Sequence, residues 1–286
     1  MRWLIIIGAT LLSLALTGCS VARLGYNNAP SLSYYWLDSY FDFDGPQTLA
    51  MREKLQSLQD WHRKEELPQW ADLLKGLQAT ATQSVTSDQV CKMYGAVVER
   101  AQAPLNYLAP AFASLALSLT QAQITHIQGE FDKRNQEWRE EWLDVKVSKR
   151  QERRQKQVAE RMEMLYGRLS DGQTALIKAL SDSAAYDPQR QFAEMLRRQQ
   201  DAIQTLNLIR STSLPPAQAN AEMQNLFARS FVSPDPTYRS YAEQARQLGC
   251  KALAEVHNLA SAEQRQKMLK TLQGYESDAR TLIANR

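Results

Sequence analysis

Glycine and proline are scarce in this chain, with 11 and 10 copies among 286 residues. No segment shows a sustained alternation of β-branched and polar residues, the pattern of a half-buried strand. Gln, Ala, Leu, Arg and Glu dominate instead, and these residues favour helices. The composition therefore disfavours strands and predicts an all-α, multi-helix bundle.

The chain also lacks a marked excess of positive or negative charge, and it contains no known catalytic motif. Lys and Arg total 34 against 31 Asp and Glu, so nothing global demands a nucleic-acid partner. There is no G-x-S-x-G elbow, P-loop or dinucleotide fingerprint, and His62, His126 and His257 lie far apart in sequence. The pairs Glu65–Glu66 and Glu140–Glu141 are adjacent, so their carboxylates diverge on a helix. We expect no catalysis, no cofactor and no metal site.

Only the N-terminus holds a long apolar run. The segment from Leu4 to Leu16 follows Arg2 and is too short to span a bilayer, as in a signal peptide. It ends in Leu16-Thr17-Gly18-Cys19, which resembles the bacterial lipobox. The resemblance implies cleavage before Cys19 and acylation of this cysteine by chains such as palmitate, which anchor a protein stably. The alternative is an ordinary secretory signal with a chance cysteine.

The residue after the lipobox predicts which of the two membranes holds the lipid anchor. Position 20 is Ser rather than Asp, which by the sorting rule of Gram-negative lipoproteins indicates the outer membrane. We therefore expect a signal peptide at 1–18 and a helical periplasmic body at 19–286, held on the periplasmic face by its lipid. No second apolar run approaches the roughly 18 residues of a transmembrane helix.

Two cysteines remain in the mature chain, Cys91 and Cys250. The periplasm is oxidising, so we expect a disulfide between them, with two buried free thiols as the alternative.

A four-residue signal recurs along the chain. Ser or Thr precedes Gln by three positions at Thr86, Thr120, Ser170 and Ser261, and Pro215 begins a defective fifth copy. This spacing is that of a capping box, in which the two side chains satisfy backbone N–H groups at a helix start. With proline starts added, we expect helices near 31–42, 46–64, 68–82, 87–102, 104–118, 121–144 running on towards 167, 171–181, 188–209, 216–230, 236–258 and 262–284.

Two segments have unusual composition. Pro104 to Leu119 is almost uncharged and predicts a central core helix kinked at Pro110. Within the expected long charged helix, the segment from Lys146 to Gln157 carries six basic residues and a single acid, Glu152. These six are expected to lie on an exposed element that meets an anionic envelope component or client protein, unless they only keep the helix solvated: Lys146, Lys149, Arg150, Arg153, Arg154 and Lys156.

Aromatic residues are concentrated near the start of the mature chain: Tyr26, Tyr34, Tyr35, Trp36, Tyr40, Phe41 and Phe43. Their rings could rest at the membrane interface, where amphipathic aromatics are favoured. The alternative, which we favour from the sequence, is a half-buried helix whose rings pack against the bundle.

Several stretches resemble a family of Gram-negative envelope lipoproteins of unknown function, among them Arg23-Leu24-Gly25-Tyr26-Asn27, Tyr35-Trp36-Leu37-Asp38 and Met164-Leu165-Tyr166-Gly167-Arg168-Leu169. The likeness extends over nearly the whole mature chain. It implies a helical envelope lipoprotein and supplies no catalytic residues.

A second, local resemblance is to the LTxxQ periplasmic stress proteins of the Spy and CpxP type. It lies in Leu119-Thr120-Gln121-Ala122-Gln123 and Leu169-Ser170-Asp171-Gly172-Gln173, on either side of the charged helix. The resemblance implies an ATP-independent holdase chaperone.

Together these features predict a non-catalytic lipoprotein that binds or scaffolds in the envelope. A holdase chaperone is the alternative, and an unrecognised enzyme is a further one. A closed pocket with converging carboxylates or histidines would favour the enzyme.

Overall fold

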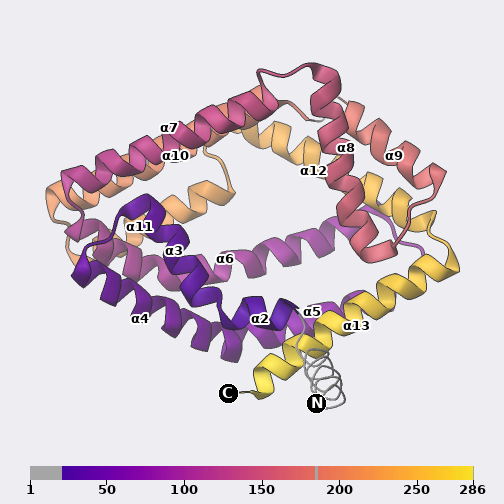
Figure 1. Ribbon diagram of the computed structural model, residues 1–286, viewed down its shortest axis with the longest axis horizontal. Coiled ribbons are helices and arrows are strands. Elements are labelled where there is room, and N and C mark those ends of the chain that lie inside the picture. The colour runs from indigo at the N-terminus through magenta and orange to yellow at the C-terminus, as the bar shows by residue number, and fades with distance from the viewer. Residues whose placement is uncertain (1–20, 184–185, 286) are drawn as a thin grey trace, which may run out of the picture.

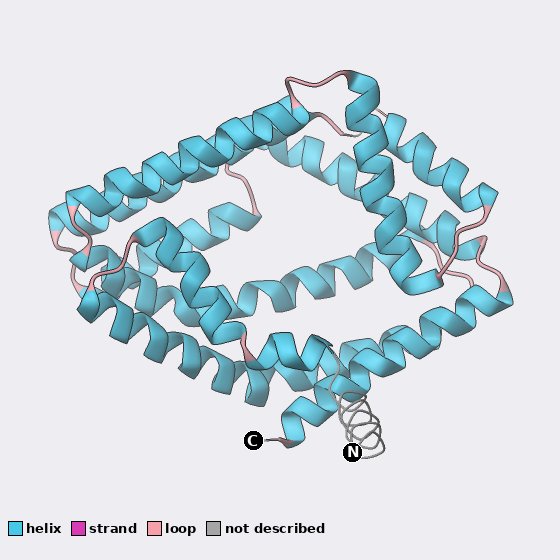
Figure 2. Ribbon diagram, viewed as in Figure 1, coloured by secondary structure: helices cyan, strands magenta, loops and turns pink. Residues whose placement is uncertain are grey.

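The computed structural model describes residues 21–183 and 186–285, and every regular element within them is helical (Figure 2). The elements are α2 (Val21–Asn27), α3 (Ala29–Phe41), α4 (Gly45–Trp61), a π-helical turn η1 (His62–Glu66), α5 (Leu67–Ala81), α6 (Ser87–Ser118), α7 (Gln121–Trp142), α8 (Val147–Tyr166), α9 (Asp171–Asp182), α10 (Pro188–Thr212), α11 (Pro216–Phe231), α12 (Pro236–Asn258) and α13 (Ala262–Ala284). The all-α prediction is confirmed, and α2 is a helix that the sequence analysis missed.

The helices lie around an elongated ring (Figure 1). Partners distant in sequence pack side by side: α13 on α5, α11 and α12 on α6, and α7 on α10. Both ends of the described chain meet, because α2 packs on α13 and Arg23 forms an ion pair with Asp278 at 3.1 Å. The C-terminal helix thus closes the ring.

The recurring four-residue signal does start helices. Thr86, Thr120, Ser170 and Ser261 each accept a hydrogen bond from the backbone N–H of the Gln three positions later, and each Gln returns one. A fifth complete box, Asp44 with Gln47, begins α4. The defective copy at Pro215 makes no side-chain cap.

The capping glutamines also join helices to one another. Gln123 uses its Oε1 for the cap, and its Nε2 donates to Asp42 O at 2.9 Å. In the same way Gln173 Nε2 donates to Val256 O at 3.1 Å and Gln264 Nε2 to Arg168 O at 2.8 Å. A glutamate would cap equally well but cannot donate, which explains why an amide occupies these positions.

Two expected helix boundaries are wrong. Residues 87–118 form one helix that continues through Pro104 and Pro110, where we had expected a break near 103. Conversely, the helix expected from 121 towards 167 ends at Trp142 and restarts at Val147. Arg150 Nη1 donates to Trp142 O at 3.0 Å and Arg153 donates to Glu141 O. Arginines of α8 thereby satisfy carbonyls at the end of α7 that a continuous helix would have satisfied itself.

The apolar core is unevenly distributed. One cluster of buried residues joins α3, α4, the C-terminal half of α6, α7, α10 and α11, with Ile124, Ile209 and Met223 among its least exposed members. Two much smaller clusters lie elsewhere, one between α5 and α13 and one around Cys250.

The second of these small clusters contains a disulfide. Cys91 near the start of α6 and Cys250 near the end of α12 are bonded, with their Cα atoms 5.4 Å apart. The bridge closes a loop with a sequence separation of 159 residues.

Candidate functional site

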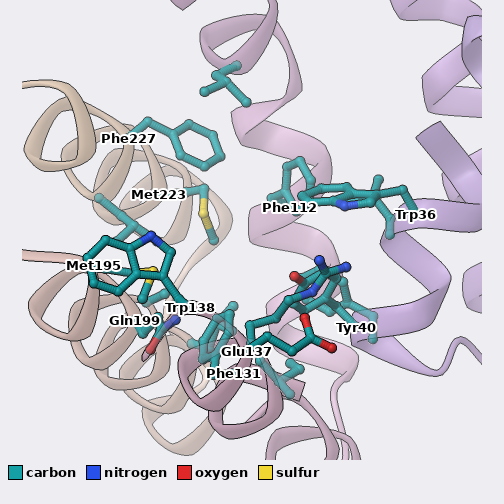
Figure 3. A pocket seen from close by; sticks show the side chains of 18 of the residues that line it. Trp36, Tyr40, Phe112, Phe131, Glu137, Trp138, Met195, Gln199, Met223 and Phe227 are labelled. Carbon is teal, nitrogen blue, oxygen red and sulfur yellow. The ribbon is translucent and has the colours of Figure 1, made fainter. Parts of the chain in front are cut away.

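Five helices enclose an apolar cavity of about 560 Å³ at one end of the ring. Its wall comes from α3, α6, α7, α10 and α11, the helices that share the largest buried cluster. Its lining residues include Trp36, Tyr40, Phe112, Phe131, Trp138, Ala202, Met195, Met223 and Phe227, and we call it the aromatic cavity. Figure 3 shows Trp36 and Tyr40 on one side and Met195, Trp138 and Phe227 on the other.

Aromatic rings form a nearly continuous lining. The Tyr40 ring lies 5.2 Å from Trp36 and 5.9 Å from Phe131, and Phe112 lies 5.8 Å from Phe227. These centroid separations fall within the range of favourable ring pairs. The rings therefore hold one another in place while leaving the space between them open.

Charge is confined to the rim of the aromatic cavity. Arg134, Glu137 and Glu141 line it but are exposed, whereas Phe131 and Trp138 of the same helix are half-buried. Glu141 forms an ion pair with Arg153 at 3.5 Å. Among the described residues Arg134 forms no ion pair, and its guanidinium lies 5.9 Å from the centre of the Tyr40 ring. The cavity thus has an apolar interior and a charged mouth.

The lining has few hydrogen-bonding groups below the charged rim, namely the side chains of Trp36, Tyr40, Trp138 and Gln199. Gln199 exchanges two hydrogen bonds of 2.9 Å with Asn135. No residue of this lining is among the buried polar atoms that lack a partner in residues 21–183 and 186–285. A ligand held here would gain mainly apolar contact below the rim.

A second apolar cavity, of about 610 Å³, lies between α5, α6, α8, α12 and α13. Met93, Val97, Leu253 and Met268 line it together with Cys250 of the disulfide, and we call it the disulfide cavity. It has more aliphatic side chains and fewer rings than the aromatic cavity.

A buried pair borders the disulfide cavity. His257 Nε2 lies 2.7 Å from Gln83 O and must donate to it, so Nδ1 of the neutral ring accepts from the Tyr166 hydroxyl at 2.8 Å. Burial lowers the pKa of His257 and raises the pKa of Tyr166 to about 12. Both groups are therefore neutral at pH 7 and act as structural hydrogen-bond partners.

The predicted basic site is only partly as expected. The three lysines are exposed, Lys149 and Lys156 on α8 and Lys146 at its N-cap. The three arginines are not. Besides the contacts of Arg150 and Arg153 with the end of α7, Arg154 lies over the Tyr186 ring at 4.4 Å, and burial lowers its pKa. The six residues do not form one exposed basic face, because the longer arginine side chains reach aromatic rings and carbonyls nearby.

Cys19 lies outside the described residues, so lipidation at this position stays a prediction. Within the described ranges no group of three or more His, Cys, Asp and Glu is placed to hold a metal ion. Among the same residues, no helix combines the length and apolarity that a membrane crossing requires.

The aromatic N-terminal stretch contributes to the site in a way that the sequence did not predict. Tyr34 is buried, whereas Trp36 and Tyr40 line the aromatic cavity. The partners of these rings on α6, α10 and α11 were missed as site residues. The uncharged stretch from Pro104 to Leu119, which supplies Phe112, was the available signal.

A family model described as a family of unknown function, DUF6279, matches residues 39–229, well over half of the chain. No curated protein and no solved structure matches. The match confirms the resemblance to a family of unknown function, and the likeness to the stress proteins stays a prediction. The matched range includes nearly all of the aromatic cavity, missing only Trp36 and Leu37 of its lining. The chain belongs to the DUF6279 family of unknown function.

Proposed function

We propose that this protein is a non-catalytic lipoprotein of the outer membrane, facing the periplasm, that binds an amphiphile with one long hydrocarbon chain. The aromatic cavity carries the proposal. Its volume of about 560 Å³ lies within the roughly 300–1,000 Å³ usual for small-molecule sites.

The lining favours a hydrocarbon chain over a peptide segment. A peptide would bring N–H and C=O groups at every residue that need partners when buried, and the lining has only a few such partners. A hydrocarbon chain needs only contact, and flexible side chains such as Met195 and Met223 adapt to its shape. An anionic head group would stay at the rim beside Arg134.

A brominated 16-carbon fatty acid tests the proposal, because bromine quenches tryptophan fluorescence at short range. The chain from Ser20 onward contains every described residue and avoids the signal peptide and Cys19. Quenching should be saturable, and most of it should disappear when Trp36 and Trp138 are changed to Phe. Trp61→Phe, which removes a tryptophan outside the cavity, should leave the quenching unchanged.

A filling substitution identifies the cavity that is occupied. Ala202 lines the aromatic cavity and Ala242 the disulfide cavity. Ala202→Phe should weaken binding by about tenfold, roughly 1.4 kcal/mol, while Ala242→Phe should not. Equal binding by wild type and Ala202→Phe would contradict the proposal.

A further inference from the structure

The outward surface of α2 and α3 is apolar and carries no charge. Large apolar side chains are exposed at Val21, Leu24, Leu32, Tyr35 and Trp36. Between Val21 and Phe41 only Arg23 and Asp38 are charged. Arg23 is paired with Asp278, and half-buried Asp38 accepts the Phe43 N–H at 3.1 Å. We call this surface, from Val21 to Trp36, the N-terminal face.

Helical spacing makes the exposed residues of α3 one stripe. Leu32, Tyr35 and Trp36 stand at i, i+3 and i+4, and Tyr34 and Leu37 are buried against the bundle. Val21 and Leu24 are spaced in the same way on α2. The exposed fractions, from 58% for Trp36 to 86% for Val21, show that the described chain leaves more than half of each of these side chains uncovered.

We infer that the N-terminal face lies on the lipid surface to which the chain is anchored. Two observations identify this occupant. The proposed acylated residue, Cys19, is two positions before Val21, so the anchor would hold this face against the bilayer. Tyr and Trp are favoured at the membrane interface, and this face combines them with leucine and carries no charge.

A cation beside the face also suits a lipid surface. Exposed Arg52 of α4 lies 3.7 Å over the Tyr34 ring and 5.7 Å from the centre of the Tyr35 ring, beside the interfacial aromatics. Lipid phosphates lie at this level of a bilayer. Trp36 belongs both to the N-terminal face and to the wall of the aromatic cavity. Docking by this face therefore brings the cavity to the source of its hydrocarbon ligand.

This inference rests on the proposed lipid anchor, and the test separates the two. The full lipidated chain is reconstituted in phosphatidylcholine vesicles with brominated acyl chains. Leu32→Trp places a depth sensor on the N-terminal face. Leu259→Trp is the matched control, an exposed leucine at the end of α12 (52% against 59% for Leu32), and neither residue lines a cavity. The fluorescence added at position 32 should be largely quenched, and that added at position 259 should not.

Charge on the face should reduce the contact without releasing the chain. In the Leu32→Trp protein, Val21→Glu with Leu24→Glu should remove most of the quenching while the chain still floats with the vesicles. Leu259→Glu should leave the quenching at position 32 unchanged. Adding anionic lipid or salt should change it little, because the face itself carries no charge.

Three results would overturn the inference. If the chain floats but position 32 is not quenched, the anchor stands and the face does not dock. If quenching at position 32 requires anionic lipid and disappears with salt, the basic residues of α8 make the contact instead. If the chain neither floats nor incorporates labelled palmitate at Cys19, the anchor and the docking fail together.

Discussion

At the end of the ring that contains the aromatic cavity, 18 buried side chains form a single cluster across α3, α4, α6, α7, α10 and α11. At the opposite end, α8, α9 and α12 meet with far less apolar burial, and the cluster around Cys250 has only four buried members. α8 itself buries only Tyr166. The second end therefore depends on individual links, namely the disulfide, the capping glutamines and the arginines of α8.

The difference predicts which end opens first. Local stability follows the density of buried apolar contacts, so the end with α8, α9 and α12 should be the weaker one. Both ends contain a cavity, which costs stability if unfilled, and only the aromatic end has a large buried cluster to offset this cost. The aromatic end is thus held together by its buried cluster, and the other end has a covalent link.

The largest expected effect comes from removing the disulfide. Cys91→Ala with Cys250→Ala should destabilise the fold by about 5 kcal/mol in the chain-entropy model for a loop of this length. Thermal unfolding should shift downward by on the order of 10 °C or more. Hydrogen exchange should accelerate in α9 and α12 and stay nearly unchanged in α7 and α11. Uniform acceleration in all four helices would show that the two ends are not independent.

The next effect concerns a capping glutamine. Gln173 is fully buried and joins α9 to α12, whereas Gln89 caps α6 at an exposed position. Gln173→Glu keeps the cap but buries a carboxylate facing the Val256 carbonyl, so we expect a loss of about 3 kcal/mol in denaturant unfolding. Gln89→Glu should be neutral within about 0.5 kcal/mol. Equal effects at both positions would mean that the link between helices adds nothing to the cap.

Helix starts were predictable from the sequence because a capping box is local: four residues contain both donors and both acceptors. The four boxes at Thr86, Thr120, Ser170 and Ser261 are all present. The second role of the glutamines was not predictable, since the acceptor of Gln173 lies 83 residues away.

The candidate site shows the same limit. Trp36 and Tyr40 were noted as an aromatic concentration, but their partners Phe112 and Phe227 come from helices distant in sequence. The basic segment is only partly exposed, in its lysines and not its arginines, for a related reason. Local composition gives the number of charges in a segment, whereas the partners that each charge reaches depend on where the chain turns, here after Trp142.

The smallest of the three effects separates the arginines of α8 from its lysines. From composition alone, changing Arg150, Arg153 and Arg154 to Gln would be neutral for stability, because glutamine also favours helices. In the structure these side chains satisfy the Trp142 and Glu141 carbonyls and cover the Tyr186 ring, so we expect a loss of about 2 kcal/mol.

The matched control uses the same number of charges on the same helix. Lys146, Lys149 and Lys156 are exposed, and Lys149 and Lys156 pair with exposed Glu152 and Glu160. Changing all three to Gln should alter stability by no more than about 0.5 kcal/mol, as expected for surface ion pairs. Equal thermal unfolding of the two triple variants would mean that the arginine contacts do not hold α8 in place. The weaker end of the ring would then depend on the disulfide and the glutamines alone.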